Sequence, residues 1–176
     1  GNLSLPLNQL ETELKRRGID VDITIAYLPV ICSVRRWVAA SGKDFESLEY
    51  AWKNLLEELF TFDGHLPAVL TEKVILIPCF DTDGFLWAME KNSAPSEPEH
   101  EPGRAGFETR CRKFIDVLQQ FFIGREEFYR GSACFYVGQC ALMEQLPDIY
   151  GRVLALEQKN VAYDGQIFYL DHERTP

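Results

Sequence analysis

An amphipathic stretch between residues 44 and 59 limits the possible folds of this chain most strongly. Its large apolar side chains recur every three or four positions, which is the spacing of one face of an α-helix. Such a helix is stable in water only when another apolar surface covers that face. Asp44 stands where an N-terminal cap belongs. The apolar stripe consists of Phe45, Leu48, Trp52, Leu55, Leu56 and Leu59.

Two later parts of the chain predict a β-sheet. Residues 73–80, with the sequence KVILIPCF, are β-branched and apolar like a buried strand, and Pro78 places the end of that strand at a sheet edge or bulge. The Asp-Gly pair that follows is the preferred turn of a hairpin, so we expect a hairpin over 73–89. Near the C-terminus a second Asp-Gly pair, at 164–165, predicts another hairpin between VLALEQKNVAY and QIFYL.

Two more helices are indicated by periodicity and by a glycine at the end of each. Apolar residues fall on one face over residues 7–17, and Gly18 follows as a C-terminal cap. Helical spacing returns over residues 107–122, with Gly124 as its stop. We therefore expect one helix at the start of the chain and another after its middle.

Two segments fit both a helix and a strand. Between residues 19 and 40, apolar residues first alternate and then also recur at helical spacing. A proline inside a helix costs about 3 kcal/mol but is tolerated at the first helical position. Pro29 therefore favours a strand over 19–27 and a helix over 29–40. Residues 133–146 are apolar and ambiguous, and we interpret them as a helix.

These elements predict an α+β fold in which four or five helices pack on a small, mainly antiparallel sheet. The 176 residues are 46% hydrophobic and include 12 Phe, 7 Tyr and 3 Trp, which is enough for one aromatic-rich core. We expect a single domain over 1–176. Residues 90–106 contain three prolines, four glutamates and no large apolar side chain, so they are predicted to form an exposed acidic loop.

Charge and cysteine usage restrict the partners and the compartment. The 27 acidic residues outnumber the 18 basic ones, and a net charge of -9 opposes non-specific binding to nucleic acid or anionic lipid. No apolar run approaches the length of a membrane span. The five cysteines are odd in number, lie mostly in apolar runs and lack C-x-x-C spacing. We expect free thiols, no zinc site, and a soluble, intracellular and cytoplasmic protein.

The sequence DTDG, from Asp81 to Gly84, follows the apolar run of the predicted strand. It resembles the first motif of the haloacid dehalogenase superfamily, in which an apolar strand runs into Asp-x-Asp-Gly-Thr. The resemblance implies that Asp81 attacks phosphate, that Asp83 handles the leaving-group proton and that magnesium neutralises charge. Phe85 stands in place of the threonine. A hairpin turn accounts for the same residues, and we interpret DTDG as that turn.

A second acidic pattern lies in LPDIYGRVLALEQKN, where Asp148 is followed by Glu157 and Lys159. It resembles the motif of the PD-(D/E)xK nucleases. The resemblance implies that Asp148 and Glu157 hold Mg²⁺ or Mn²⁺ and that Lys159 orients the attacking water. A tight turn at 151–152 would make the two carboxylates cross-strand neighbours. Solvent-facing residues of a hairpin are the alternative interpretation.

The sequence favours a non-catalytic protein-interaction or regulatory module. An aromatic core is present, but we find no phosphate-binding glycine loop and no serine, cysteine or histidine in a recognisable nucleophile setting. The partner is expected to be a protein, and no cofactor is predicted. The alternative is a divalent-metal-dependent nuclease or phosphodiesterase that uses Asp148, Glu157 and Lys159. A small-ligand binding domain is a third hypothesis.

Overall fold

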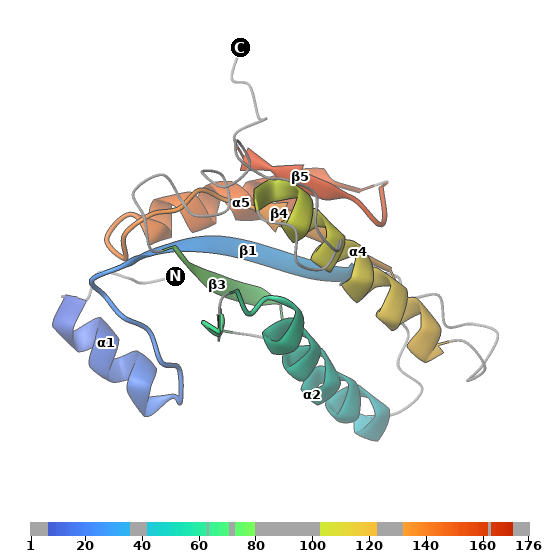
Figure 1. Cartoon of the computed structure of the whole chain (residues 1–176), viewed down its shortest axis with the longest axis horizontal. Coiled ribbons are helices and arrows are strands. Elements are labelled where there is room, and N and C mark those ends of the chain that lie inside the picture. Colours follow the sequence, from blue (N-terminus) through green and yellow to red (C-terminus); the bar gives the residue numbers. More distant parts are fainter. Residues whose placement is uncertain are drawn as a thin grey trace, which may run out of the picture.

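The computed structural model describes residues 7–35, 42–62, 64–70, 73–79, 103–122, 132–161 and 163–170. Within these residues, four helices pack on a five-stranded, mostly antiparallel sheet (Figure 1). The predicted α+β class is therefore confirmed. The elements are α1 (Leu7–Arg16), β1 (Ala26–Arg35), α2 (Gly42–Leu59), β2 (Ala68–Val69), β3 (Val74–Cys79), α4 (Gly103–Phe122), β4 (Ser132–Val137), α5 (Leu146–Lys159) and β5 (Ile167–Tyr169).

Strand β1 lies at the centre of the sheet, whose order is β2-β3-β1-β4-β5. It pairs antiparallel with β3 on one side and with β4 on the other. Strand β5 runs parallel to β4, and α5 connects the two as a crossover helix. The sheet therefore combines three antiparallel strands from the first half of the chain with one β-α-β unit, β4-α5-β5, from its C-terminal part.

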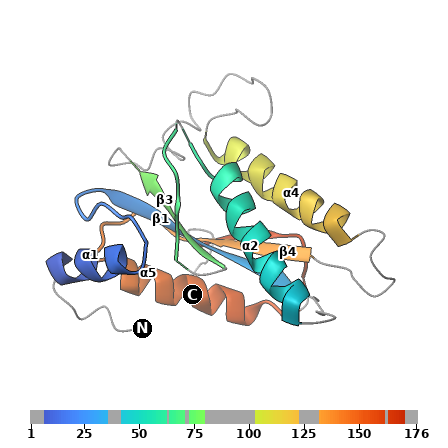
Figure 2. The same cartoon turned by 90° about the horizontal axis from the view of Figure 1, so that it is seen from below.

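Helices cover both faces of the sheet, so successive residues of β1 enter two different parts of the core. Figure 2 shows α2 and α4 across one face and α5 on the other. Leu14 of α1 packs against the same apolar cluster as Leu146 of α5. Leu28, Val30 and Cys32 point to the α2 and α4 side, whereas Tyr27 and Ile31 point to the α5 side. All six residues of β3 are buried, as expected for a strand that is covered on both faces.

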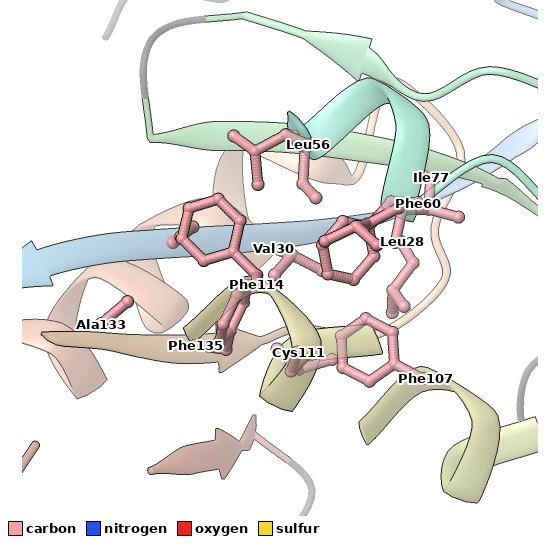
Figure 3. Close-up of a cluster of buried hydrophobic side chains, with 14 of the residues drawn as sticks. Leu28, Val30, Leu56, Phe60, Ile77, Phe107, Cys111, Phe114, Ala133 and Phe135 are labelled. Atoms are coloured by element: carbon pink, nitrogen blue, oxygen red, sulfur yellow. The ribbon is translucent and has the colours of Figure 1, made fainter. Parts of the chain in front are cut away.

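Phenylalanine rings join α2 and α4 to the sheet (Figure 3). The centroid of Phe60 lies 5.6 Å from that of Phe107 and 5.8 Å from that of Phe135. Phe114 meets Phe135 edge to face at 5.6 Å. Such pairs contribute about 0.5–1.5 kcal/mol each beyond the burial of their area. The predicted aromatic-rich core thus lies mainly on this face.

The predicted helix over 29–40 is wrong, because residues 26–35 form the central strand β1; residues 36–41 lie outside the described part of the chain. The strand predicted over 19–27 is correct only for its last two residues. The prediction failed because Pro29 was assigned to the start of a helix. In the structure Pro29 occupies a strand that is paired on both sides.

A β-bulge beside Pro29 makes this position possible. Gly138 lies opposite Pro29 and donates its N–H to the Pro29 carbonyl over 2.9 Å. An unbroken register would then pair Tyr27 with Cys140, but Tyr27 exchanges both backbone hydrogen bonds with Ala141, at 2.9 and 3.0 Å. One extra residue therefore lies on the β4 side. Prolines inside sheets occur at such interruptions, where a missing N–H disturbs no regular ladder.

The C-terminal hairpin was predicted correctly only in its second half. QIFYL forms β5, but VLALEQKNVAY is largely part of helix α5, and β5 pairs with β4 instead. Ile149, Val153 and Leu156, at helical spacing, pack against the sheet. The interpretation of 133–146 as a helix is also wrong, since 132–137 is strand β4.

Other predictions fall partly inside the described residues. Helices α1, α2 and α4 and strand β3 are confirmed, although α2 begins at Gly42 and not after Asp44. Residues 103–106 belong to α4, so the acidic loop predicted over 90–106 is shorter at that end. Residues 80–102, which include the DTDG sequence, lie outside the described part. No helix in the described ranges is long and apolar enough to cross a membrane.

Two of the five cysteines form a disulfide, so the prediction of five free thiols is wrong. Cys79 at the end of β3 is bonded to Cys140 beyond β4, with Cα atoms 6.5 Å apart. Cys32, Cys111 and Cys134 are free and buried. The sequence did not reveal the pair because its members are 61 residues apart and meet only when both strands flank β1.

Substitution of Gly138 tests the fit around Pro29. A Cβ atom at this position would lie 2.8 Å from Pro29 Cγ, 2.9 Å from Ile149 Cγ2 and 3.0 Å from Val153 Cγ2. We expect Gly138→Ala to lower the free energy of unfolding by about 1–3 kcal/mol in denaturant titrations. The loss should be smaller when Pro29→Ala is also present, because one of the three contacts is then removed.

Gly151→Ala is the matched control for Gly138→Ala. Gly151 lies inside α5, and a Cβ atom there has nothing within 4 Å. Alanine should raise the free energy of unfolding by about 0.5–1 kcal/mol, because glycine is a poor helix former. A Gly138→Ala variant as stable as the wild type would contradict the close fit of β1, β4 and α5.

Thiol counting tests the disulfide. The denatured chain, prepared under air, should react at three thiols without reductant and at five after reduction. Closing a loop of 61 residues stabilises the folded state by about 4 kcal/mol in the chain-entropy model. A reductant should therefore lower the melting temperature of the wild type but not that of a Cys79→Ser, Cys140→Ser variant. Five reactive thiols before reduction would contradict the bond.

Candidate binding groove

The predicted metal ligands do not lie together. Asp148 is exposed in the first turn of α5, and Glu157 lies in the last two turns of the same helix. Nine residues of helix place them about 13 Å apart along the axis and on opposite sides of it. The predicted hairpin that would have made them neighbours is replaced by this helix. The described residues contain no group of three or more His, Cys, Asp or Glu side chains that could hold a metal ion.

Glu157 contacts a cation elsewhere in the fold. Its carboxylate oxygens lie 3.1 and 3.3 Å from Nζ of Lys73, and its side chain is only 14% exposed. This ion pair ties the end of α5 to the start of β3. Lys159 is exposed at the last residue of α5. The structure therefore gives Glu157 a structural contact, and it does not bring Asp148 and Lys159 to a common site with it.

A groove of about 580 Å³ opens at the β2 edge of the sheet. Its walls come from three segments: the loop that follows α1, the second half of α2, and the turn that leads into β2. Its volume falls within the range of about 300–1,000 Å³ that is typical of ligand sites. The groove is therefore the candidate functional site of the described part of the chain.

Hydrogen bonds hold the first wall in place. Gly18 lies two residues beyond the end of α1, and its φ of 78° is the left-handed conformation that glycine adopts readily. The Ile19 N–H returns to the Leu14 carbonyl over 2.8 Å. Four residues later in the loop, Asp22 Oδ1 accepts a hydrogen bond of 2.8 Å from the Thr24 N–H. The loop therefore has a defined shape.

Tyr27 connects this wall to the central strand. Its side chain is buried and its hydroxyl oxygen accepts a hydrogen bond of 2.7 Å from the Asp22 N–H. Burial raises the pKa of the Tyr27 phenol, and the carboxylates of Asp22 and Asp20 act in the same direction. The phenol therefore stays neutral at physiological pH. Tyr27 thus forms part of the groove floor and anchors the loop above it.

Tyr27 and Pro78 form the floor of the groove, which lies beyond the end of the short strand β2. Strand β2 pairs only with Leu76 and Ile75 of β3, so Pro78 lies beyond its reach and lines the groove. Pro78 is opposite Tyr27, whose backbone groups bond to Ala141 on the other side. The backbone nitrogen of Pro78, which carries no hydrogen, therefore faces the open edge of the sheet. The predicted placement of Pro78 at a sheet edge agrees with this arrangement.

Arg110 fixes the turn that forms the third wall. Its Nη1 donates to the carbonyls of Leu59 and Thr61, each over 2.7 Å, at the end of α2. Its guanidinium lies 4.0 Å from the ring centroid of Phe62. Phe62 in turn pairs with His65 through a backbone hydrogen bond of 2.9 Å from the His65 N–H. An arginine of α4 thereby sets the position of the chain before β2.

The groove carries a negative charge. Among the lining residues that the structure describes, Asp20, Asp22 and Glu57 supply three carboxylates and Lys53 supplies one ammonium group. Hydrogen bonds from the side chain and backbone of Thr24 lower the pKa of Asp22, which keeps this carboxylate ionised. His65 also lines the groove.

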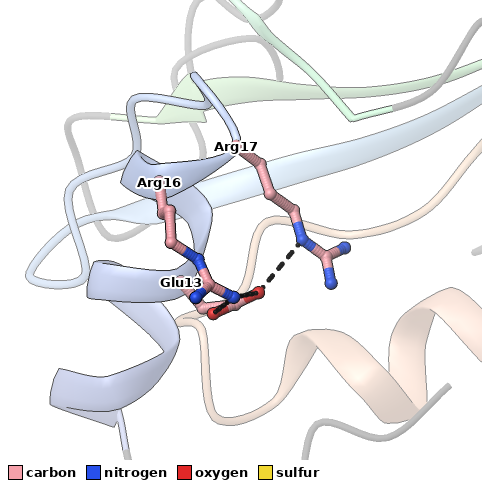
Figure 4. A network of polar contacts seen from close by, with 3 residues as sticks. All are labelled: Glu13, Arg16 and Arg17. Carbon is pink, nitrogen blue, oxygen red and sulfur yellow. Dashed lines mark hydrogen bonds and ion pairs between the residues drawn. The ribbon is translucent and has the colours of Figure 1, made fainter.

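The arginines at the end of α1 do not offset this charge. Both are paired with Glu13 on the same helix (Figure 4). Arg16 Nη2 lies 2.7 and 2.6 Å from the two carboxylate oxygens, and Arg17 Nε lies 3.3 Å from one of them. Lys15 is likewise 3.7 Å from Glu11. The basic residues closest in sequence to the groove wall are therefore held by acids of α1.

Comparison with known proteins gives no family to which the chain could be assigned. No family model, no curated protein and no solved structure matches it. The amino-acid sequence alone does not reveal the groove, because its walls come from three segments that are far apart in the chain. The sequence of each segment alone predicts only a turn or a solvent-exposed helix face.

Removing the Tyr27 hydroxyl tests how the groove wall is anchored. Tyr27→Phe leaves the Asp22 N–H without its partner, and we expect the free energy of unfolding to fall by about 1–2 kcal/mol. Tyr50→Phe is the matched control, because Tyr50 is 70% exposed, and it should change stability by only a few tenths of a kcal/mol. Hydrogen exchange should show faster exchange at Asp22 in Tyr27→Phe alone. Equal stability of the two variants would contradict the anchoring role.

Proposed function

We propose that this chain is a non-catalytic protein-interaction domain and that a partner protein binds in the groove. The observation that carries this proposal is the combination of a concave site with large exposed apolar side chains beside it. Leu66 lines the groove and is 63% exposed. Exposed apolar groups around a concave surface are typical of interaction sites.

Tyr50 extends the same surface along α2. It precedes Lys53 by three residues and Glu57 by seven, so all three side chains lie on one face of the helix. Tyrosine is enriched among the residues that contribute most to binding, because it combines a large rigid ring with a polar group. A partner that enters the groove between α2 and the α1 loop would also cover Tyr50.

The sheet edge favours recognition of side chains over strand addition. A partner strand that paired with the open edge of β3 would need backbone donors there. Pro78 offers none, and β2 occupies the edge next to Ile75 and Leu76. We therefore expect a partner segment to bind through its side chains in the groove, with few main-chain hydrogen bonds to the sheet.

Site-specific photo-crosslinking tests this function. A photoreactive amino acid at position 66 should label a discrete partner protein in an extract of the source cells. The same group at position 161, which is 82% exposed after the end of α5, is the control and should not label that partner. Excess wild-type chain should compete for the labelling, whereas a Tyr50→Ala, Leu66→Ser variant should not.

Both groove substitutions replace exposed side chains, so the competitor variant should be as stable as the wild type. Its melting temperature checks this directly. Equal labelling from positions 66 and 161, or equal competition by the wild type and a folded variant, would show that the groove is not the binding site.

A further inference from the structure

We infer that the groove selects a cationic segment of its partner, in which a lysine or arginine side chain lies between Asp20 and Glu57. This inference rests on the proposed interaction function and adds the chemistry of the partner. It follows from the balance of charge in the groove, from the elements that supply the carboxylates, and from the apolar residues that line the same groove.

The charge balance is set by residues that the fold does not neutralise locally. The described residues that line the groove supply two more carboxylates than ammonium groups when His65 is neutral. Arg16 and Arg17 are paired with Glu13 (Figure 4). Lys15 is paired with Glu11, although its charge also lowers the pKa of Asp22. An acidic segment entering the groove would be repelled, whereas a basic one would be attracted and would associate faster at low salt.

The acidic groups come from separate elements. Asp20 is exposed on the loop after α1, and Glu57 is half-buried on α2. Ile19 and Ile25 contribute apolar surface to the same groove. Lysine and arginine have long apolar stems that pack on such surface while the charged end stays near carboxylates and water. One side chain of this kind matches both properties of the groove.

Substitution of Lys53 tests the direction in which charge in the groove changes the binding affinity. It is exposed and lies four residues before Glu57, on the same helical face. If the groove binds cations, removal of this ammonium group should strengthen binding, while removal of either carboxylate should weaken it. A purely structural effect of these exposed substitutions would not produce opposite signs.

The experiment is a selection of random linear peptides displayed on phage against the immobilised full chain. Counter-selection on a folded Tyr50→Ala, Leu66→Ser variant, which adds no charge to the groove, retains only peptides that need the groove. We expect the retained peptides to be enriched in lysine and arginine next to apolar residues. Synthetic versions of these peptides then serve as the probes for measurements of Kd.

Charge variants complete the test. Asp20→Asn and Glu57→Gln should each weaken binding of a selected peptide by about two- to fivefold, and Lys53→Gln should strengthen it by a similar factor. Raising the salt concentration should reduce these differences. Glu58→Gln is the control, because Glu58 is an exposed neighbour of Glu57 that does not line the groove, and it should leave Kd unchanged.

The possible failures are distinguishable. Groove-dependent peptides without cationic enrichment, or variants whose effects all have the same sign, would overturn the cationic preference while leaving the interaction function intact. A selection that yields no groove-dependent peptide, together with no crosslink from position 66, would overturn both.

Discussion

Double burial of the central strand is the constraint on which the structure depends. Strand β1 pairs along both edges and is covered by helices on both faces, so its residues from Tyr27 to Cys32 are all buried. Pro29 would normally be excluded from such a position. It is accommodated because β4 bulges beside it and because Gly138 leaves space for its ring against α5. The packing of α5 on the sheet is thus coupled to one proline of β1.

The groove depends on the same strand. Tyr27 is bonded through its backbone to Ala141 and through its hydroxyl to the loop that forms the groove wall. The Cys79–Cys140 disulfide joins the segments on either side of this part of β1. A change in the bulge would therefore be felt at the binding surface, because Tyr27 is bonded to Ala141 beside the bulge and also lines the groove. The fold places a rigid support below this loop, and the buried side chain of Val21 packs in the same cluster as Tyr27.

Local sequence patterns predicted the elements whose conformation does not depend on one particular residue far away in the chain. Helices α1, α2 and α4 follow from their apolar stripes, and β3 follows from its β-branched run. Strand β1 was missed because the reason that Pro29 fits lies at Gly138, more than a hundred residues away.

The failures at the C-terminus have a similar cause. Helix α5 was missed because a short Asp-Gly hairpin signal was given more weight than the helical spacing of Ile149, Val153 and Leu156. That error also created the apparent pairing of Asp148 with Glu157. The groove could not have been predicted either, because no single segment carries its shape or its charge. Its recognition required the relative positions of α1, α2 and β2.

The topology also affects the chain during its synthesis. Strand β1 is made roughly a hundred residues before β4, its partner along one full edge, so this edge stays unpaired for about 5 to 20 s at ordinary elongation rates. The segment AYLPVICSV is apolar and β-prone, and such segments aggregate through cross-β pairing. A proline interrupts that pairing. Pro29 therefore protects the nascent chain at the point where the finished sheet needs a bulge to receive it.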